Sequence, residues 1–138
     1  MMYSQNKAAA QYRSVSSHGL VAEASPTRLV QIMYEQILAN LANAQGCMGR
    51  IHGNLPLAEV RAKCAAMSKA LRLIAHLDAT LNMEQGGQVA ANLRNLYGYM
   101  MNRLTQANVV NDPAIVAEVV NLLATIKRGW DQLVADGR

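Results

Sequence analysis

The sequence contains no phenylalanine, and aromatic residues make up only 4% of it. No segment approaches the roughly 20 consecutive apolar residues that span a bilayer. No run alternates apolar and polar residues with the period of two that indicates a half-buried strand. We therefore expect neither membrane insertion nor a β-sheet fold.

Cysteine is also scarce: Cys47 and Cys64 are the only two, and they do not form a C-x-x-C motif. The first 19 residues include Lys7 and Arg13 but no apolar stretch of the kind that a secretory signal requires. Isolated thiols without such a signal are typical of reduced, intracellular proteins. A cytoplasmic location is the expectation.

Residue patterns for catalysis or metal binding are missing. The three histidines, at positions 18, 52 and 76, lie far apart and have no acidic partners at metal-ligand spacing. Ser16-Ser17-His18 has no acidic residue to orient the histidine, and Gly86-Gly87 is not followed by the G-K-[ST] of a phosphate loop. We expect no enzyme activity, no cofactor and no metal.

The net charge of +4 is modest and scattered along the chain. Nucleic-acid binding usually requires a continuous basic face, so we interpret the basic residues as parts of solvated helix faces. A small basic helical nucleic-acid-binding or regulatory protein is the alternative hypothesis. The densest basic groups are Arg61, Lys63, Lys69, Arg72 and the pair Lys127-Arg128.

Apolar residues recur every three or four positions in four long segments, as in amphipathic helices. Ser25-Pro26 and Asp112-Pro113 each combine an N-cap with a proline suited to a first helical turn. Short links between such segments make neighbouring helices antiparallel. We predict an all-α, up-down-up-down four-helix bundle over residues 25–138, with helices at about 26–49, 56–82, 84–109 and 113–135, and a flexible arm at 1–24.

The inner apolar stripe of the second helix is predicted to run from Leu57 to Leu81, and that of the third from Val89 to Ala107. Three of the eight methionines lie on such stripes and are expected in the core: Met33, Met67 and Met100. Further apolar residues form rows beside the stripes, which predicts that these helices contact more than one neighbour.

Several stretches resemble the flagellar secretion chaperone family FliS. They include Leu77-Asp78-Ala79-Thr80-Leu81-Asn82-Met83-Glu84-Gln85-Gly86-Gly87, continuing to Leu93, and then Leu96-Tyr97-Gly98-Tyr99-Met100. Ser25-Pro26, the segment from Glu118 to Trp130, and the arm with Met2-Tyr3, Gln11-Tyr12 and Val15 also resemble that family in order and separation. Gly98 departs from the family pattern, which usually has an aspartate there.

The resemblance implies a chaperone that binds the disordered C-terminal segment of flagellin, prevents its early polymerisation and delivers it to the flagellar type III export gate. An amphipathic partner segment would dock in a groove between helices. From the side rows we predict partner-binding residues Leu73, Leu77, Tyr97, Met101 and Leu104. The resemblance also implies that Tyr3, Tyr12 and Val15 on the arm cap the empty groove. Which groove is used and the oligomeric state stay open.

Overall fold

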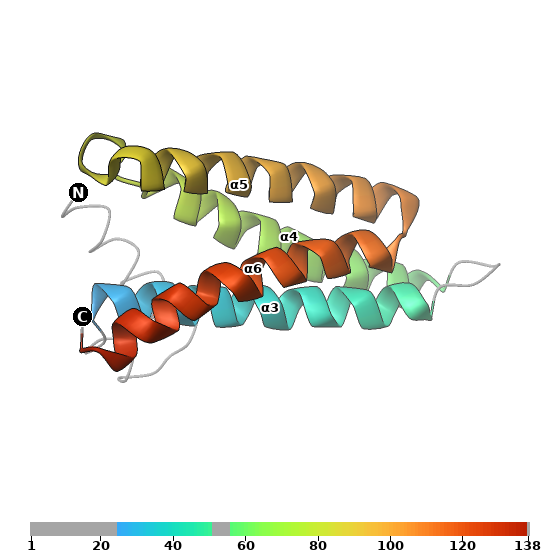
Figure 1. Ribbon diagram of the computed structural model, residues 1–138. Coiled ribbons are helices and arrows are strands. Elements are labelled where there is room, and N and C mark those ends of the chain that lie inside the picture. Colours follow the sequence, from blue (N-terminus) through green and yellow to red (C-terminus); the bar gives the residue numbers. More distant parts are fainter. Residues whose placement is uncertain (1–24, 51–55, 138) are drawn as a thin grey trace.

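The computed structural model describes residues 25–50 and 56–137. This part of the chain forms an antiparallel bundle of four helices, which confirms the expected fold class (Figure 1). Two helices begin and end where the sequence predicts, whereas the second is shorter than predicted and the third slightly longer. The helices are α3 (Pro26–Gly49), α4 (Leu57–Ala79), α5 (Met83–Val110) and α6 (Pro113–Ala135).

Side-chain caps start three of the helices, and two of them, Ser25 and Asp112, were predicted from the sequence. The Ser25 hydroxyl accepts a hydrogen bond from the Arg28 N–H at 3.2 Å, and the Asp112 carboxylate accepts one from the Ala114 N–H at 2.9 Å. The Asn82 side chain does the same for α5, accepting from the Gln85 N–H at 3.0 Å. Each such bond satisfies one of the N–H groups that the first helical turn leaves unpaired.

Helix α5 has a break in its first turn, at the double glycine. Gly87 adopts φ 54° and ψ −134°, a conformation that only glycine enters without strain. A β-carbon on Gly86 would lie 2.5 Å from the β-carbon of Ala90, so this position must also lack a side chain. Both glycines are therefore needed where the chain turns from α4 into α5.

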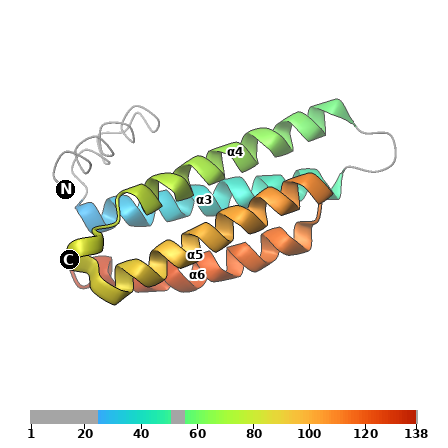
Figure 2. The same ribbon diagram turned by 90° about the horizontal axis from the view of Figure 1, so that it is seen from above.

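The four helices follow one another around the bundle (Figure 2). Helix α3 packs against α4 and α6, and α5 packs against the same two, so α3 and α5 face each other diagonally. The α3–α4 contact is the most extensive of the four and the α5–α6 contact is the smallest. The bundle is thus unequally packed, with α5 and α6 the least closely joined neighbours.

The core includes Met33, Met67 and Met100, as the stripes predict. Tyr34 of α3 and Tyr97 of α5 join their hydroxyls in a hydrogen bond across the centre. Burial raises the pKa of both phenols above the ordinary value for tyrosine. A polar pair in an apolar interior is tolerated because one hydroxyl donates its hydrogen bond to the other.

Three expectations about individual positions are wrong. Leu57, the first residue of α4, and Val89, in the first half of α5, were placed on inner stripes by periodicity but are 60% and 69% exposed. Lys63, expected on a solvated face, is buried. Its ammonium donates to the Asn108 carbonyl at 3.0 Å and to the Asn111 side chain at 3.4 Å, so it caps the C-terminal end of α5.

Among the helices in the described ranges, none combines the length and the apolar character needed to cross a bilayer.

Candidate functional site

One polar cluster joins α5 to α6. The carboxylate of Glu118 accepts hydrogen bonds from the Arg103 guanidinium and from the Tyr99 hydroxyl, each at 2.7 Å. The hydrogen bond from Arg103, followed by that from Tyr99, lowers the pKa of the Glu118 carboxyl. This cluster lies in the half of the bundle where α6 begins and α5 ends.

On the other side of this cluster the two helices separate. Figure 1 shows α5 and α6 diverging toward the start of α5 and the end of α6. No residue of α6 after Leu123 is buried, and before Tyr97 the only buried residue of α5 is Ala90. The apolar stripes continue along both helices here, but their side chains are exposed or only partly buried.

Five apolar residues mark this region, and we call them the open seam. On α5 they recur at three- and four-residue spacing, which keeps them on one face, and on α6 they are four residues apart. Val89 is exposed, and the other four are half-buried against the core. The members of the open seam are Val89, Leu93 and Leu96 of α5 and Leu122 and Ile126 of α6.

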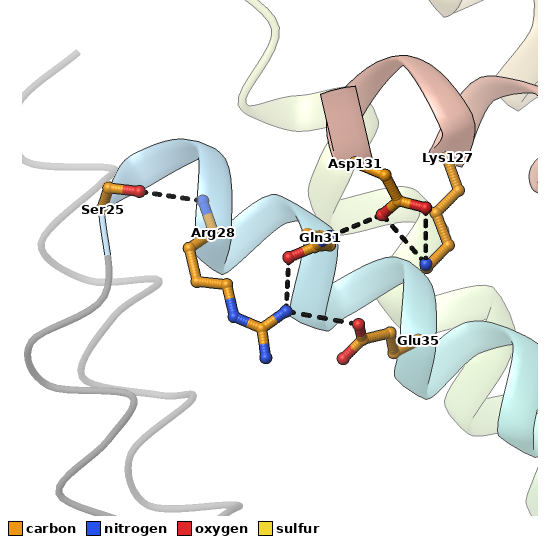
Figure 3. A network of polar contacts seen from close by, with 6 residues as sticks. All are labelled: Ser25, Arg28, Gln31, Glu35, Lys127 and Asp131. Carbon is orange, nitrogen blue, oxygen red and sulfur yellow. Dashed lines mark hydrogen bonds and ion pairs between the residues drawn. The ribbon is translucent and has the colours of Figure 1, made fainter. Parts of the chain in front are cut away.

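In this region polar contacts join α5 and α6 to their other neighbours and not to each other. Asp131 of α6 accepts from the Gln31 amide of α3 at 2.5 Å and from the Lys127 ammonium at 3.0 Å, which ties the end of α6 to α3 (Figure 3). Arg94 of α5 pairs with Asp78 of α4 at 3.4 Å. The end of α6 is therefore joined to α3 and the start of α5 to α4, which leaves the open seam between the two pairs.

The same network extends along the first turns of α3. The Arg28 guanidinium donates to the side-chain amide oxygen of Gln31 and pairs with Glu35 at 3.3 Å (Figure 3). Gln31, Lys127 and then Arg28 surround Asp131, and the hydrogen bond from Gln31 is the main cause that lowers the pKa of the Asp131 carboxyl. A charged, hydrogen-bonded carboxylate holds the end of α6 in place.

Trp130 packs against the core at this end of the bundle. Its ring is half-buried and meets the ring of Tyr34 edge-on, with 6.5 Å between ring centroids. Edge-to-face aromatic pairs add about 0.5–1.5 kcal/mol beyond the area that they bury. The contact directs Trp130 toward α3. Leu122 and Ile126 follow Glu118 at four-residue intervals, so they lie on the side of α6 from which Glu118 contacts α5.

The open seam is apolar in character and is suited to an apolar partner. Within residues 25–50 and 56–137, no group of histidine, cysteine, aspartate and glutamate side chains could hold a metal ion. Apolar contact contributes about 25 cal/mol for each Å² removed from water. An amphipathic helix with apolar residues at i, i+3, i+4 and i+7 would pack these residues against the side chains of the open seam.

The structure places the partner-binding residues predicted from the sequence in two different environments. Leu77, Tyr97 and Leu104 are 4%, 1% and 0% exposed, so the expectation that they form an accessible side row is wrong. They face the centre of the bundle, where their own chain already covers them. Leu73 and Met101 are half-buried against the core, and contact with a partner stays a prediction for them. The predicted cap residues Tyr3, Tyr12 and Val15 lie outside the described residues.

Sequence reasoning found the residues of the open seam but gave them a different role. It placed Val89, Leu93 and Leu96 on the inner stripe of the third helix, because periodicity identifies the apolar face of a helix. The same pattern cannot reveal whether a neighbouring helix covers that face along its whole length. No local signal in the sequence separates the covered half of the α5–α6 contact from the open half.

Comparison with known proteins gives consistent similarities. The model of the family "Flagellar protein FliS" matches residues 7–137. The chain is 39% identical over 125 residues to the flagellar secretion chaperone FliSB of Pseudomonas aeruginosa, covering 91% of this chain and 94% of that protein. It is 36% identical to the flagellar secretion chaperone FliS of Vibrio cholerae, and 37% identical to that of Salmonella typhimurium. Each of these two alignments covers 88% of this chain, with 85% and 86% of the respective relative.

Proposed function

This chain belongs to the FliS family of flagellar secretion chaperones, and from that we propose that it binds the disordered C-terminal segment of flagellin in the cytosol. Binding would keep flagellin subunits from polymerising early. The complex would then be delivered to the export gate of the flagellar type III apparatus. Flagellin as the substrate, the cytosolic location and delivery to the gate follow from the resemblance to the family.

The open seam is the observation that supports this proposal. Leu93, Leu96, Leu122 and Ile126 remain half-buried although each lies on the apolar face of its helix. Fully burying one leucine or isoleucine side chain contributes about 1.5–3 kcal/mol relative to leaving it exposed. A disordered segment that folds on binding loses part of this gain in ordering itself, but it can follow a long surface.

The binding residues that we propose are therefore those of the open seam. The core residues predicted from the sequence would need the bundle itself to open before they met a partner. Leu73 and Met101 would be secondary contacts, because they are partly covered and lie outside the seam. The arm is proposed to cover the seam in the absence of flagellin, through Tyr3, Tyr12 and Val15. A chain lacking residues 1–15 would then bind the flagellin segment more tightly.

The test is a comparison of full-length flagellin with flagellin lacking its C-terminal segment. We expect binding to the first alone, measured by titration calorimetry. Equal binding to both forms, or to neither, would remove the proposal. Because the seam is apolar, binding should change little between low and moderate salt, whereas binding through phosphate contacts weakens steeply.

Site-directed changes locate the contact. Leu96→Asp and Ile126→Asp each place a charge in the open seam and should weaken binding by at least about tenfold, since a buried unpaired charge is costly. Val109→Asp is the matched control, because Val109 lies on α5, is 79% exposed and is outside the seam. Thermal unfolding of each variant, followed by circular dichroism, reports whether the bundle is intact.

A further inference from the structure

Most basic side chains in the described ranges have a polar partner, and a few have none. Five of them each form an ion pair with a carboxylate, and Lys63 caps α5. Arg128 donates to the Thr125 hydroxyl. The five paired residues are Arg28, Arg50, Arg94, Arg103 and Lys127.

The remaining three described cations share one helix. Arg61, Lys69 and Arg72 are exposed on α4, and none has a hydrogen bond or ion pair with another residue of the described ranges. Both acidic residues of α4 are already engaged, Glu59 by Arg50 and Asp78 by Arg94. The outer face of α4 is therefore positive, and no carboxylate within residues 25–50 and 56–137 neutralises it.

Small side chains separate these cations. From Arg61 to Ala75, every exposed residue of α4 is basic, alanine or serine. The distance from Arg61 to Arg72 along the helix axis is roughly 16 Å at 1.5 Å per residue. We call this surface the basic α4 face: Arg61, Ala65, Ser68, Lys69 and Arg72.

The face is not the open seam. Helix α4 is diagonal to α6, and the buried residues Met67, Ala70 and Ile74 lie on the opposite side of α4 from the cations. A partner on the basic α4 face and a segment in the open seam would occupy different sides of the bundle. The two surfaces also differ in chemistry, since one offers unpaired positive charge and the other apolar side chains.

We propose that the basic α4 face docks an acidic helix of a second protein partner. Alanine and serine between the cations allow a helix to approach closely, because interaxial distance depends on the side chains at the contact. Glutamates or aspartates three or four residues apart on that helix would reach Arg61, Lys69 and Arg72. Charge complementarity of this kind accelerates association and selects the partner more than it adds affinity.

Two other anionic partners fit this face less well. Proteins that neutralise DNA commonly make six to ten phosphate contacts, and this face offers only three exposed cations with no aromatic side chain for base stacking. A membrane-surface helix needs large apolar residues beside its cations, and the exposed neighbours here are alanine and serine. An acidic protein helix requires neither feature.

The test uses the full chain and a synthetic alanine-based helical peptide with glutamates at i, i+4, i+7 and i+11. Titration of the ¹⁵N-labelled protein should shift the amide resonances of α4 between Ala58 and Ala75, and the shifts should vanish when lysines replace the glutamates. Shifts confined to other helices would overturn the proposal. Single-stranded DNA or anionic lipid vesicles binding this face more tightly than the peptide would also overturn it.

A charge-matched pair of variants provides the second test. Arg61→Gln/Lys69→Gln/Arg72→Gln should weaken peptide binding by at least about fivefold. Gln36→Glu/Asn102→Glu/Asn121→Glu lowers the net charge by the same amount, at exposed positions on the other three helices. This variant should change the affinity for the peptide by less than about twofold. Equal weakening in both would show a general charge effect and reject the site.

Binding of the flagellin C-terminal segment provides an independent measurement on the same variants. It should stay within about twofold of the parent protein in both, because neither variant changes the open seam. Loss of peptide binding with flagellin binding intact therefore supports this face whatever the outcome for the seam. The single change Arg72→Gln, at an exposed position, tests the same surface if the triple variant does not fold.

Discussion

The hydroxyls of Tyr34 and Tyr97 share a hydrogen bond at the centre of the bundle, joining the diagonal helices α3 and α5. Both rings are almost fully buried, at 0% and 1% exposed. The relationship assigns Tyr97 to the core, although the sequence favours a role in partner binding. It also implies that proton release from these phenols must accompany unfolding at high pH.

The first prediction concerns that pH dependence. Burial raises the pKa of Tyr34 and Tyr97 in the folded protein above the pKa of tyrosine in the unfolded chain, which is about 10. Their contribution to stability is therefore fully present below pH 10 and is lost as the pH rises above that value. Each phenol should lower the free energy of unfolding by up to about 1.4 kcal/mol per pH unit in that range. Urea unfolding between pH 8 and pH 11 measures the slope.

The variant Tyr34→Phe/Tyr97→Phe should show a shallower decline above pH 10, since it removes both phenols together and leaves neither hydroxyl unpaired. Tyr99→Phe is the control, because Tyr99 is exposed and donates to Glu118 at the surface. An identical alkaline slope in the double variant and the parent protein would contradict the prediction.

The second prediction uses two glycines of α5. Gly98 lies inside the helix, and a β-carbon there would meet no atom within 4 Å. Gly98→Ala should therefore raise the free energy of unfolding by about 1 kcal/mol. Gly87→Ala should lower it by more than that, because φ at this residue is 54°. Urea midpoints of the two variants provide the comparison, and destabilisation by Gly98→Ala would be the contrary result.

The third prediction concerns the buried cap on α5. Lys63→Met keeps the apolar stem of the side chain but removes the ammonium that binds the Asn108 carbonyl. We expect a loss of about 1–2 kcal/mol in the free energy of unfolding, since hydrogen bonds of charged groups and cations at helix C-termini both stabilise. Lys69→Met, at an exposed position of the same helix, should change it by less than about 0.5 kcal/mol. Equal effects of the two changes would show that the cap adds nothing.

Much of the bundle follows from local physical chemistry and was accessible from the sequence. Ser25 and Asp112 mark helix starts because their side chains satisfy free N–H groups, and Met67 and Met100 are buried because their helices are amphipathic along the packed length. These signals lie within one turn or one helix, so they do not depend on how the helices are arranged.

How the helices are arranged around one another could not be predicted from the sequence in this way. Val89 and Leu104 occupy the same stripe of α5, yet one is 69% exposed and the other fully buried, because α6 diverges from the first half of α5 only. The polar contacts of this region, Gln31 to Asp131 and Arg94 to Asp78, connect residues on different helices. Helical periodicity contains no information about such pairs.

The fourth prediction addresses the open seam with the most direct measurement. Methyl-labelled protein is titrated with the flagellin C-terminal segment and followed by nuclear magnetic resonance. The largest shifts should fall on Val89, Leu93, Leu96, Leu122 and Ile126, with little change at the exposed Leu57 and Val109. Shifts concentrated on Leu57 and Val109, with the seam methyl groups unmoved at saturation, would contradict the account.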